Sequence, residues 1–140
     1  MVQTLIVTHG GLAQALLDTA RHITGELHDV HSLALDWNEP REALLGRLES
    51  VAAHIDQGQG VLILTDLYGD TPANLALGLI RPGRVEVVTG VNLPMVLRLS
   101  CIGARPMELA ELARWIQEKG RQGIRVGEPV PADAVEEPVR

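Results

Sequence analysis

The sequence predicts an α/β fold: a doubly wound, mostly parallel sheet with helices on both faces. Short apolar runs alternate along the chain with longer segments of helical periodicity, and the links between them are short. The apolar runs lack a strict polar alternation, which is typical of strands buried on both faces. With 140 residues, 46% of them hydrophobic and only 2% aromatic, we expect one domain with an aliphatic core.

The first half of the chain is predicted to hold three strands and two helices. The three apolar runs that predict strands are Val2–Thr8, Val30–Leu35 and Val61–Thr65. Leu12–Ile23 carries apolar residues at helical spacing, and Gly25 follows as a candidate C-terminal cap. Pro40–Ile55 is predicted to be a helix because proline suits a first turn and leucines recur along one side.

The second half continues the alternation. Thr71–Ile80 predicts a helix capped by Thr71, with Pro72 at its first position. Val85–Thr89 predicts a fourth strand. Two further segments are predicted helices: Leu93–Leu99 and Met107–Lys119.

The C-terminal segment is predicted to divide into a short strand and a tail. Ile124–Val126 could form a last strand, either in this sheet or paired with another subunit. Residues 127–140 are acidic and rich in proline, so we expect them to lie outside the domain formed by residues 1–126.

Charge and composition exclude several classes of protein. The formal net charge of −6 argues against nucleic-acid binding, which needs a basic face. No apolar run approaches the roughly 20 residues that cross a bilayer, and the N-terminus lacks the pattern of a signal peptide. We therefore expect a cytoplasmic protein. The single cysteine, Cys101, excludes an intrachain disulfide and is expected to be a small core residue.

A histidine and an aspartate follow two of the predicted strands directly. His9 ends the first apolar run, and Asp66 ends the third. Ligands of open α/β sheets bind at the carboxyl ends of strands, and a neutral imidazole is a nucleophile near neutral pH. We interpret His9 as a candidate phosphorylated nucleophile and Asp66 as the carboxylate that orients it. For Asp66, an ordinary role in a turn stays open.

The same edge offers groups that could hold an anion. Gly10 and Gly11 precede a helix, and the hydroxyl of Thr71 lies where another helix begins. Asn74 and Asn92 are expected to be structural. Two histidines, His28 and His31, have a spacing seen in metal sites, but no cysteine or paired acid completes a ligand set. We expect no metal and no cofactor, and the sequence lacks nucleotide-binding and serine-hydrolase motifs.

Three segments carry a resemblance to a known family: THGGLAQALL near the N-terminus, LTDLYGDTPANLA in the middle and TGVNLPMVLRL after the fourth predicted strand. Together they resemble the IIA component of the mannose-type bacterial sugar phosphotransferase system, in particular its fructose subfamily. The resemblance implies a homodimer joined by the last strand. It also implies that His9 takes a phosphoryl group from the phosphohistidine of the carrier protein HPr and passes it to a IIB component. Asp66 would be the partner of that histidine, and Thr71 would bind the phosphate.

One departure from the family pattern keeps alternatives open. The family motif is usually DLFGG or DLWGG, whereas this chain has DLYGD, and the Asp70 carboxylate would repel phosphate unless it turns away. The acceptor could be a separate IIB component or a regulatory target. A non-catalytic regulatory or anion-binding protein of the same fold is the alternative. A receiver domain phosphorylated on Asp66 is disfavoured because Thr8-His9-Gly10 offers no acidic pair for magnesium.

Overall fold

The protein contains one four-stranded parallel sheet. The computed structural model describes residues 1–36, 38–68 and 71–132. The strands are β1 (Gln3–Val7), β2 (Val30–Leu33), β3 (Val61–Thr65) and β4 (Val85–Val88). Their order across the sheet is β2-β1-β3-β4, and all three pairings are parallel. The predicted fold class is confirmed.

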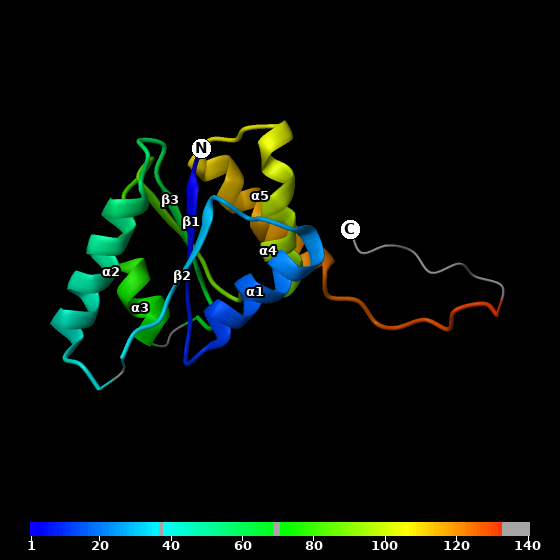
Figure 1. Ribbon diagram of the computed structural model, residues 1–140, viewed down its shortest axis with the longest axis horizontal. Helices are drawn as coiled ribbons and strands as arrows, with labels where there is room; N and C mark the ends of the chain where they lie inside the picture. The colour runs from blue at the N-terminus through cyan, green and yellow to red at the C-terminus, as the bar shows by residue number, and fades with distance from the viewer. Residues whose placement is uncertain (37, 69–70, 133–140) are drawn as a thin grey trace.

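Helices cover both faces of this sheet (Figure 1). Three helices form one layer: α1 (Leu12–Thr24), α4 (Leu93–Arg98) and α5 (Leu109–Gln122). Two form the other: α2 (Arg41–Ile55) and α3 (Thr71–Leu77). No helix in the described ranges is both long and apolar enough to span a membrane.

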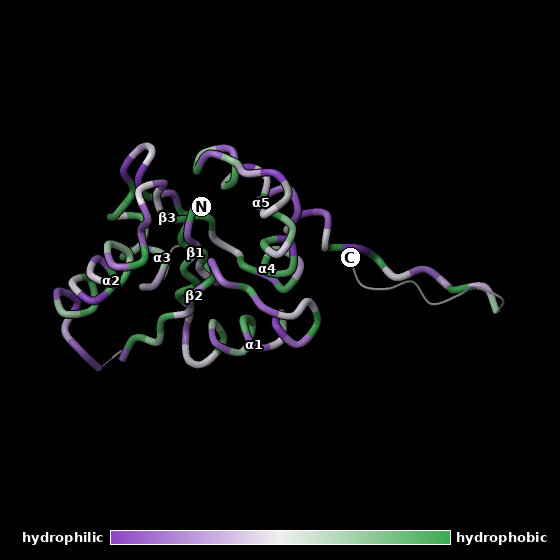
Figure 2. Tube along the Cα trace, turned by 45° about the horizontal axis from the view of Figure 1, so that its top comes forward, coloured by the Kyte–Doolittle hydropathy of each residue, from purple (hydrophilic) through white to green (hydrophobic). Residues whose placement is uncertain are grey.

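The core is aliphatic and lies on both sides of the central strands. Side chains alternate between the two faces of a strand, so Ile6 joins the cluster under α1, α4 and α5, while Leu5 and Val7 join the cluster under α2 and α3. All five residues of β1 and all five of β3 are buried. Figure 2 shows hydrophobic positions concentrated where these strands run between the helix layers. Burial on both faces explains why the strands lack a polar alternation.

The strand order places a topological switch between β1 and β3. From β1 the chain moves outward to β2, and from β3 it moves outward to β4 on the other side. Val7, the last residue of β1, lies beside Thr65, the last residue of β3. The connections leave these two ends in opposite directions, so a crevice opens where they meet, and this is where open α/β sheets bind ligands.

One glycine next to β3 is required by both conformation and space. Gly60 has φ +89°, and a Cβ there would lie 2.9 Å from the Arg84 carbonyl oxygen and 2.8 Å from Leu109 Cδ2. Gly58 also has a positive φ, +99°, but has open space around it. Gly60 therefore allows the turn before β4 and the start of α5 to approach the start of β3.

Several predicted boundaries differ from the structure by a few residues. The largest differences are that β2 ends at Leu33, α3 ends at Leu77 and α5 extends to Gln122. The C-terminal cap at Gly25 is confirmed, with φ 87°. Thr71 is the first residue of α3 rather than the residue that caps it. Its predicted capping role is therefore wrong, because the helix begins one residue earlier than Pro72 suggested.

The expectation for Cys101 is also wrong, because this cysteine is exposed. The chain continues from α4 into a 3₁₀ helix, η1 (Leu99–Ala104). A 3₁₀ helix has three residues per turn, so residues three apart share a face. Leu99 and Ile102 take the inward face, and Cys101 is turned outward.

Ile124–Val126 form no strand within this single chain. The side chains of Ile124 and Val126 are 78% and 93% exposed. Residues 127–132 are exposed and contain neither helix nor strand, and Figure 1 shows the chain leading away from the helices here. The rest of the predicted tail, residues 133–140, lies outside the described residues.

Candidate active site

The structure brings His9 and Asp66 together at the switch point. Thr8 separates His9 from the end of β1, and Asp66 directly follows the end of β3. Since β1 and β3 are neighbours, two residues 57 positions apart meet: His9 Nδ1 lies 2.8 Å from Asp66 Oδ2. The side chain of His9 is 50% exposed, whereas that of Asp66 is 11% exposed. The imidazole therefore faces solvent and its carboxylate partner lies behind it.

The Asp66 carboxylate is fixed by three N–H donors. Oδ2 accepts from the His9 ring and from the His9 backbone N–H at 3.0 Å, and Oδ1 accepts from the Leu67 backbone N–H at 3.0 Å. Burial alone would raise the pKa of Asp66, but the hydrogen bonds from the side chain and backbone of His9 outweigh it and lower that pKa. Asp66 is therefore an anionic acceptor at neutral pH.

This pairing fixes the tautomer of the His9 ring. A carboxylate can only accept hydrogen bonds, so the neutral ring carries its proton on Nδ1 and its lone pair on Nε2. Nε2 is therefore the ring atom that could act as a nucleophile. If Nε2 forms a bond to phosphorus, the ring becomes cationic, and the adjacent carboxylate stabilises it.

The turn after His9 presents backbone N–H groups at the same edge. Gly10 has φ +50°, a conformation that disfavours other residues, and Gly11 is the N-cap residue of α1. Among the described residues, neither glycine donates its N–H to a protein acceptor. These two donors suit an anion held beside His9.

A threonine that the sequence analysis did not single out is part of this turn. Thr8 is 1% exposed, and its Oγ1 accepts a hydrogen bond from the Ala13 N–H at 2.7 Å. The same hydroxyl donates to the His9 carbonyl oxygen at 3.2 Å. The available signal was a threonine at the end of a strand, directly before the candidate nucleophile.

The remaining predicted site residues lie near this edge or have structural roles. Thr71 is exposed at the start of α3. Asp70, whose charge was predicted to oppose phosphate binding, lies outside the described residues. Asn92 is structural as expected, because its side chain caps α4 by accepting from the Met95 N–H at 3.1 Å. Asn74 lies exposed on α3.

The other histidines form no metal centre in the part of the chain that the structure describes, where no three potential ligands cluster. His28 is exposed beside Glu26. His31 Nε2 lies 2.8 Å from the buried Gln3 side-chain oxygen, and the Gln3 amide donates to Asp29 at 2.8 Å. Burial lowers the pKa of His31, the Asp29 charge opposes this shift, and the Arg21 charge adds to it.

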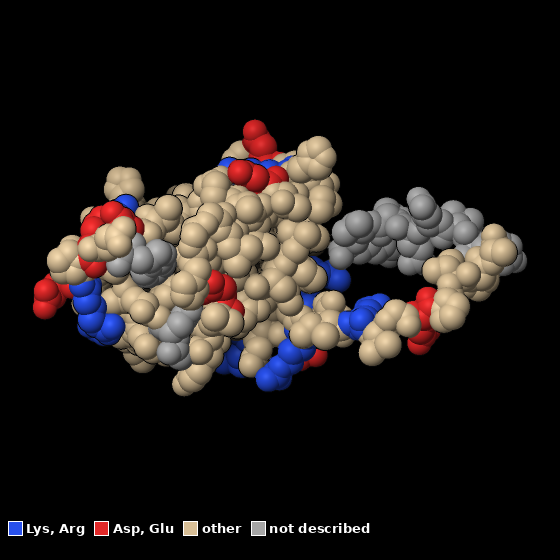
Figure 3. Space-filling view, turned by 90° about the horizontal axis from the view of Figure 1, so that it is seen from below, with Lys and Arg blue, Asp and Glu red and all other residues tan. Residues whose placement is uncertain are grey.

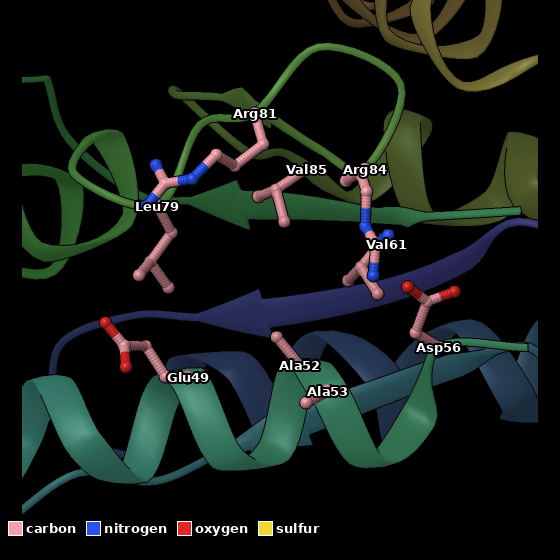
Figure 4. Close-up of a pocket in the computed structure, with 9 residues that line it drawn as sticks. All are labelled: Glu49, Ala52, Ala53, Asp56, Val61, Leu79, Arg81, Arg84 and Val85. Carbon is pink, nitrogen blue, oxygen red and sulfur yellow. The ribbon is translucent and has the colours of Figure 1, made fainter. Parts of the chain in front are cut away.

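A cavity of about 250 Å³ lies at the opposite end of the sheet, between α2 and the turn before β4. Figure 4 shows Arg81 and Arg84 on one wall, and Glu49 and Asp56 on the α2 side. The two guanidinium groups point to opposite ends of the cavity, so no single anion meets both. This cavity therefore does not compete with the His9 edge as an anion site.

The surface around the His9–Asp66 pair is suited to contact with another protein. Leu67 and Tyr68 are 58% and 79% exposed, and Leu12 at the start of α1 is 44% exposed. The carboxyl ends of the strands face downward in Figure 1, and in the view from below in Figure 3 uncharged residues cover most of this face, with a group of acidic side chains near its middle. Exposed apolar side chains beside a reactive group are typical of a docking surface.

Comparison with known proteins identifies the family of this chain. The family model described as "PTS system fructose IIA component" (EIIA-man), where PTS is the phosphotransferase system, matches residues 3–117. The chain belongs to the EIIA-man family. That match spans both His9 and Asp66 and includes every strand of the sheet.

Curated relatives of this EIIA-man chain are components of the same system. The mannose-specific EIIAB component of Escherichia coli K12 is 31% identical over 133 residues, which are 94% of this chain and 41% of that protein. The sorbose-specific EIIA component of Klebsiella pneumoniae is 35% identical over 101 residues, 71% of this chain and 73% of that protein. The chain thus spans about two fifths of the length of the EIIAB relatives it matches.

Solved structures of EIIA proteins share this fold. The mannose/sorbose-specific IIA subunit from Enterococcus faecalis aligns with a TM-score of 0.79 and 23% identity, covering 93% of this chain and 97% of that one. An EIIA component from Streptococcus agalactiae aligns with a TM-score of 0.78 and 22% identity, covering 90% and 97%. At these identities the likeness shows the EIIA-man architecture alone.

Proposed function

We propose that this protein is a phosphocarrier of the bacterial sugar phosphotransferase system. His9 accepts a phosphoryl group from phospho-HPr and passes it to a IIB component. The observation that carries the proposal is the 2.8 Å contact between His9 Nδ1 and Asp66 Oδ2 at the carboxyl edge of the sheet. That contact fixes the tautomer of a half-exposed imidazole, so that Nε2 carries the lone pair.

The proposed step moves one phosphoryl group between two imidazoles. The lone pair of His9 Nε2 forms a bond to phosphorus, and the bond from phosphorus to the ring nitrogen of HPr breaks. The electron pair of the broken bond returns to the HPr imidazole. His9 becomes a cationic phosphoimidazole, whose charge the Asp66 carboxylate balances. Because such transfer depends mainly on alignment and charge stabilisation, the rigid His9–Asp66 pair is well suited to it.

The phosphoryl oxygens need hydrogen-bond donors during this transfer. We assign this role to the N–H groups of Gly10 and Gly11 and to the hydroxyl of Thr71, which begins α3 at the same edge. Backbone N–H groups at the start of a helix favour anions because of the helix dipole. Donors already in place stabilise charge in the transition state without reorganisation.

The proposed partners are HPr as donor and a IIB component, or a regulatory target, as acceptor. Relatives named EIIAB carry the IIA and IIB designations in the name of one protein. The chain described here matches about two fifths of their length, so we propose a IIB partner that is separate from residues 1–126.

We also propose a homodimer joined through the segment Ile124–Val126. Among the described residues β4 is an edge strand, with β3 on one side and on the other a single bridge between Val85 and Arg81. Ile124, Val126 and Val130 are all more than 75% exposed, an unfavourable state for large apolar side chains. Pairing of this segment with β4 of a second copy would give the outer side of β4 a neighbouring strand and would bury apolar side chains of the segment. Sedimentation of the full chain should give a dimer, and Val126→Asp should shift it toward monomer. A monomeric wild-type chain would refute this part.

The phosphocarrier proposal is tested by incubating the protein with phosphoenolpyruvate, enzyme I and HPr. We expect the intact mass to rise by one phosphoryl group, and the adduct to be lost in acid and kept in alkali. His9→Ala should abolish the gain, whereas His54→Ala, which changes an exposed histidine on α2, should not.

Two results would count against the proposal. Labelling of His9→Ala would move the site elsewhere. No labelling of the wild-type chain, with HPr known to be phosphorylated, would favour a non-catalytic regulatory or anion-binding protein.

A further inference from the structure

Two buried threonines occupy comparable places beside the site, yet only one has a hydrogen-bonded hydroxyl. Thr8 directly precedes His9, and Thr65 directly precedes Asp66; they are 1% and 0% exposed. The Thr8 hydroxyl bonds to both His9 and Ala13. In the part of the chain that the structure describes, the Thr65 hydroxyl has no partner. The contrast separates the effect of a bonded hydroxyl from the effect of burying a threonine.

The Thr8 hydroxyl connects the backbone of His9 to the first turn of α1. It donates to the His9 carbonyl oxygen at 3.2 Å, and that oxygen also accepts from the Leu12 N–H at 3.3 Å. On its other side the His9 backbone N–H donates to Asp66 Oδ2 at 3.0 Å. The peptide groups on both sides of His9 are therefore held, one by Asp66 and one by Thr8 and Leu12.

The same hydroxyl determines which N–H groups of the turn are available to an anion. Ala13 has its N–H satisfied by Thr8 Oγ1 at 2.7 Å, and this bond is buried. The Leu12 N–H donates to the His9 carbonyl oxygen, and the next two N–H groups toward His9, those of Gly11 and Gly10, have no protein acceptor among the described residues. Thr8 thus accepts from the buried N–H of the turn, and the N–H groups of Gly10 and Gly11 stay available to an anion.

We infer that Thr8 is a positioning residue for phosphoryl transfer. Its hydroxyl sets the backbone of His9, and through it the direction of Nε2, relative to the Gly10 and Gly11 donors. Thr8 acts only through these neighbours, because its side chain is buried and does not reach the phosphoryl group. This inference rests on the proposed phosphocarrier function, and it adds a residue to that site.

The physical consequence of removing the hydroxyl is a shift of the turn. In Thr8→Val the shape of the side chain is kept, but the buried Ala13 N–H loses its acceptor, so the first turn of α1 must move to find another. A displacement of about 1 Å at a reacting group can lower a rate about 10²-fold. We therefore expect a large effect on transfer from a side chain that touches no substrate.

The test compares Thr8→Val with Thr8→Ser and with the matched control Thr65→Val. Transfer from phospho-HPr is measured by rapid quench as kcat and KM, and NMR of the imidazole nitrogens reports the tautomer of His9 without any partner. We expect Thr8→Val to lower kcat about 10²-fold with KM unchanged, and to weaken the ring nitrogen signature of the bond to Asp66. Thr8→Ser keeps the hydroxyl and should restore both readouts. Thr65→Val should match wild type in both.

Three outcomes would overturn the inference. They are wild-type kcat in Thr8→Val, the same loss in Thr65→Val as in Thr8→Val, and a loss in Thr8→Ser as large as in Thr8→Val. If Thr8→Val does not fold, Thr8→Ser is compared with wild type instead, and a loss of about 10²-fold in kcat of the folded Thr8→Ser protein would overturn the inference. If the wild-type chain accepts no phosphoryl group, the proposed function fails. The NMR comparison then still decides whether Thr8 positions His9.

Discussion

Replacing Asp66 with asparagine tests the role of the carboxylate behind the His9 ring. The change keeps the size of the side chain and removes its charge. An amide has one accepting oxygen, whereas the carboxylate uses both: Oδ2 for the two donors of His9 and Oδ1 for the Leu67 N–H. If the amide oxygen takes the place of Oδ2, its NH₂ group faces the Leu67 N–H, and that bond is lost.

The magnitude follows from these three bonds. A hydrogen bond to a charged group contributes about 1.5–3 kcal/mol and a neutral one about 0.5–1.5 kcal/mol, so each of the two His9 bonds weakens by about 1 kcal/mol. The lost Leu67 bond, which is also to a charged group, is worth about 1.5 kcal/mol at the lower end of its range. The His9 side chain is 50% exposed, so solvent screens part of these contributions. We expect a loss of about 2–3 kcal/mol in the free energy of unfolding at neutral pH, or about 10 °C in Tm.

The effect on transfer is separate from the effect on stability. Without the carboxylate, the cationic phosphoimidazole loses its compensating charge, and the rate of transfer from phospho-HPr should fall about 10²-fold. Rapid-quench transfer and urea unfolding are the assays. Asp56→Asn is the matched control, because Asp56 Oδ1 alone accepts from the Gly58 and Gly60 N–H groups and an amide oxygen can replace it. A wild-type transfer rate in Asp66→Asn would refute the orienting role.

The pH dependence of Asp66→Asn gives a second check. The pKa of Asp66 is lowered in the folded chain, so its carboxylate stabilises the fold above its ordinary pKa. That contribution is lost as the pH falls through the lowered value, below about pH 4. The difference in unfolding free energy between wild type and Asp66→Asn should therefore be largest at neutral pH and disappear in acid. A difference that stays constant down to pH 2 would contradict this account.

Three further perturbations have expected outcomes. Gly60→Ala should lower the free energy of unfolding in urea by about 2–4 kcal/mol, because it combines a left-handed backbone with overpacking. Gly58→Ala should lower it by about 1–2 kcal/mol, from the backbone conformation alone. Equal losses in the two variants would exclude crowding at Gly60. Gly10→Ala should slow transfer and lower Tm because its φ is +50°, whereas Gly11→Ala has open space and an ordinary φ and should do neither. NMR titration should give His31 a pKa below its ordinary value. The unfolded chain then binds a proton on His31 at a higher pH than the folded chain does, so acidification below about pH 6.5 should begin to destabilise the fold. An unshifted titration would show that burial does not control the pKa of His31.

The fold class was predictable because burial controls the residue pattern. Val61–Thr65 is a fully buried strand, and its unbroken apolar run matched the structure from end to end. Helix ends were less predictable, because capping depends on neighbours that the pattern does not show. Thr71 has the chemistry of a cap yet begins α3 itself. The pattern also could not show that a 3₁₀ turn would direct Cys101 outward.

The candidate site was predictable in part for a different reason. His9 and Asp66 each follow an apolar run, and parallel strands bring their carboxyl ends to one edge. The 2.8 Å contact required in addition that β1 and β3 be neighbours, which the sequence does not state locally. The position of Thr8 directly before His9 was a signal in the sequence, but its bond to the Ala13 N–H depends on the path of the turn, which the pattern does not show.

The position of β1 and β3 in the middle of the sheet has a consequence for how the protein fluctuates. β2 and β4 are edge strands with one neighbour each, whereas β1 and β3 have neighbours on both sides and are completely buried. Local opening starts where few contacts must break, and the proposed dimer covers β4 but leaves β2 at an edge, so amide protons of β2 should exchange with solvent before those of residues 4–7 and 62–65. His9 and Asp66 are attached to the slowest-opening part of the molecule. Their alignment should therefore persist while the edges of the sheet open and close.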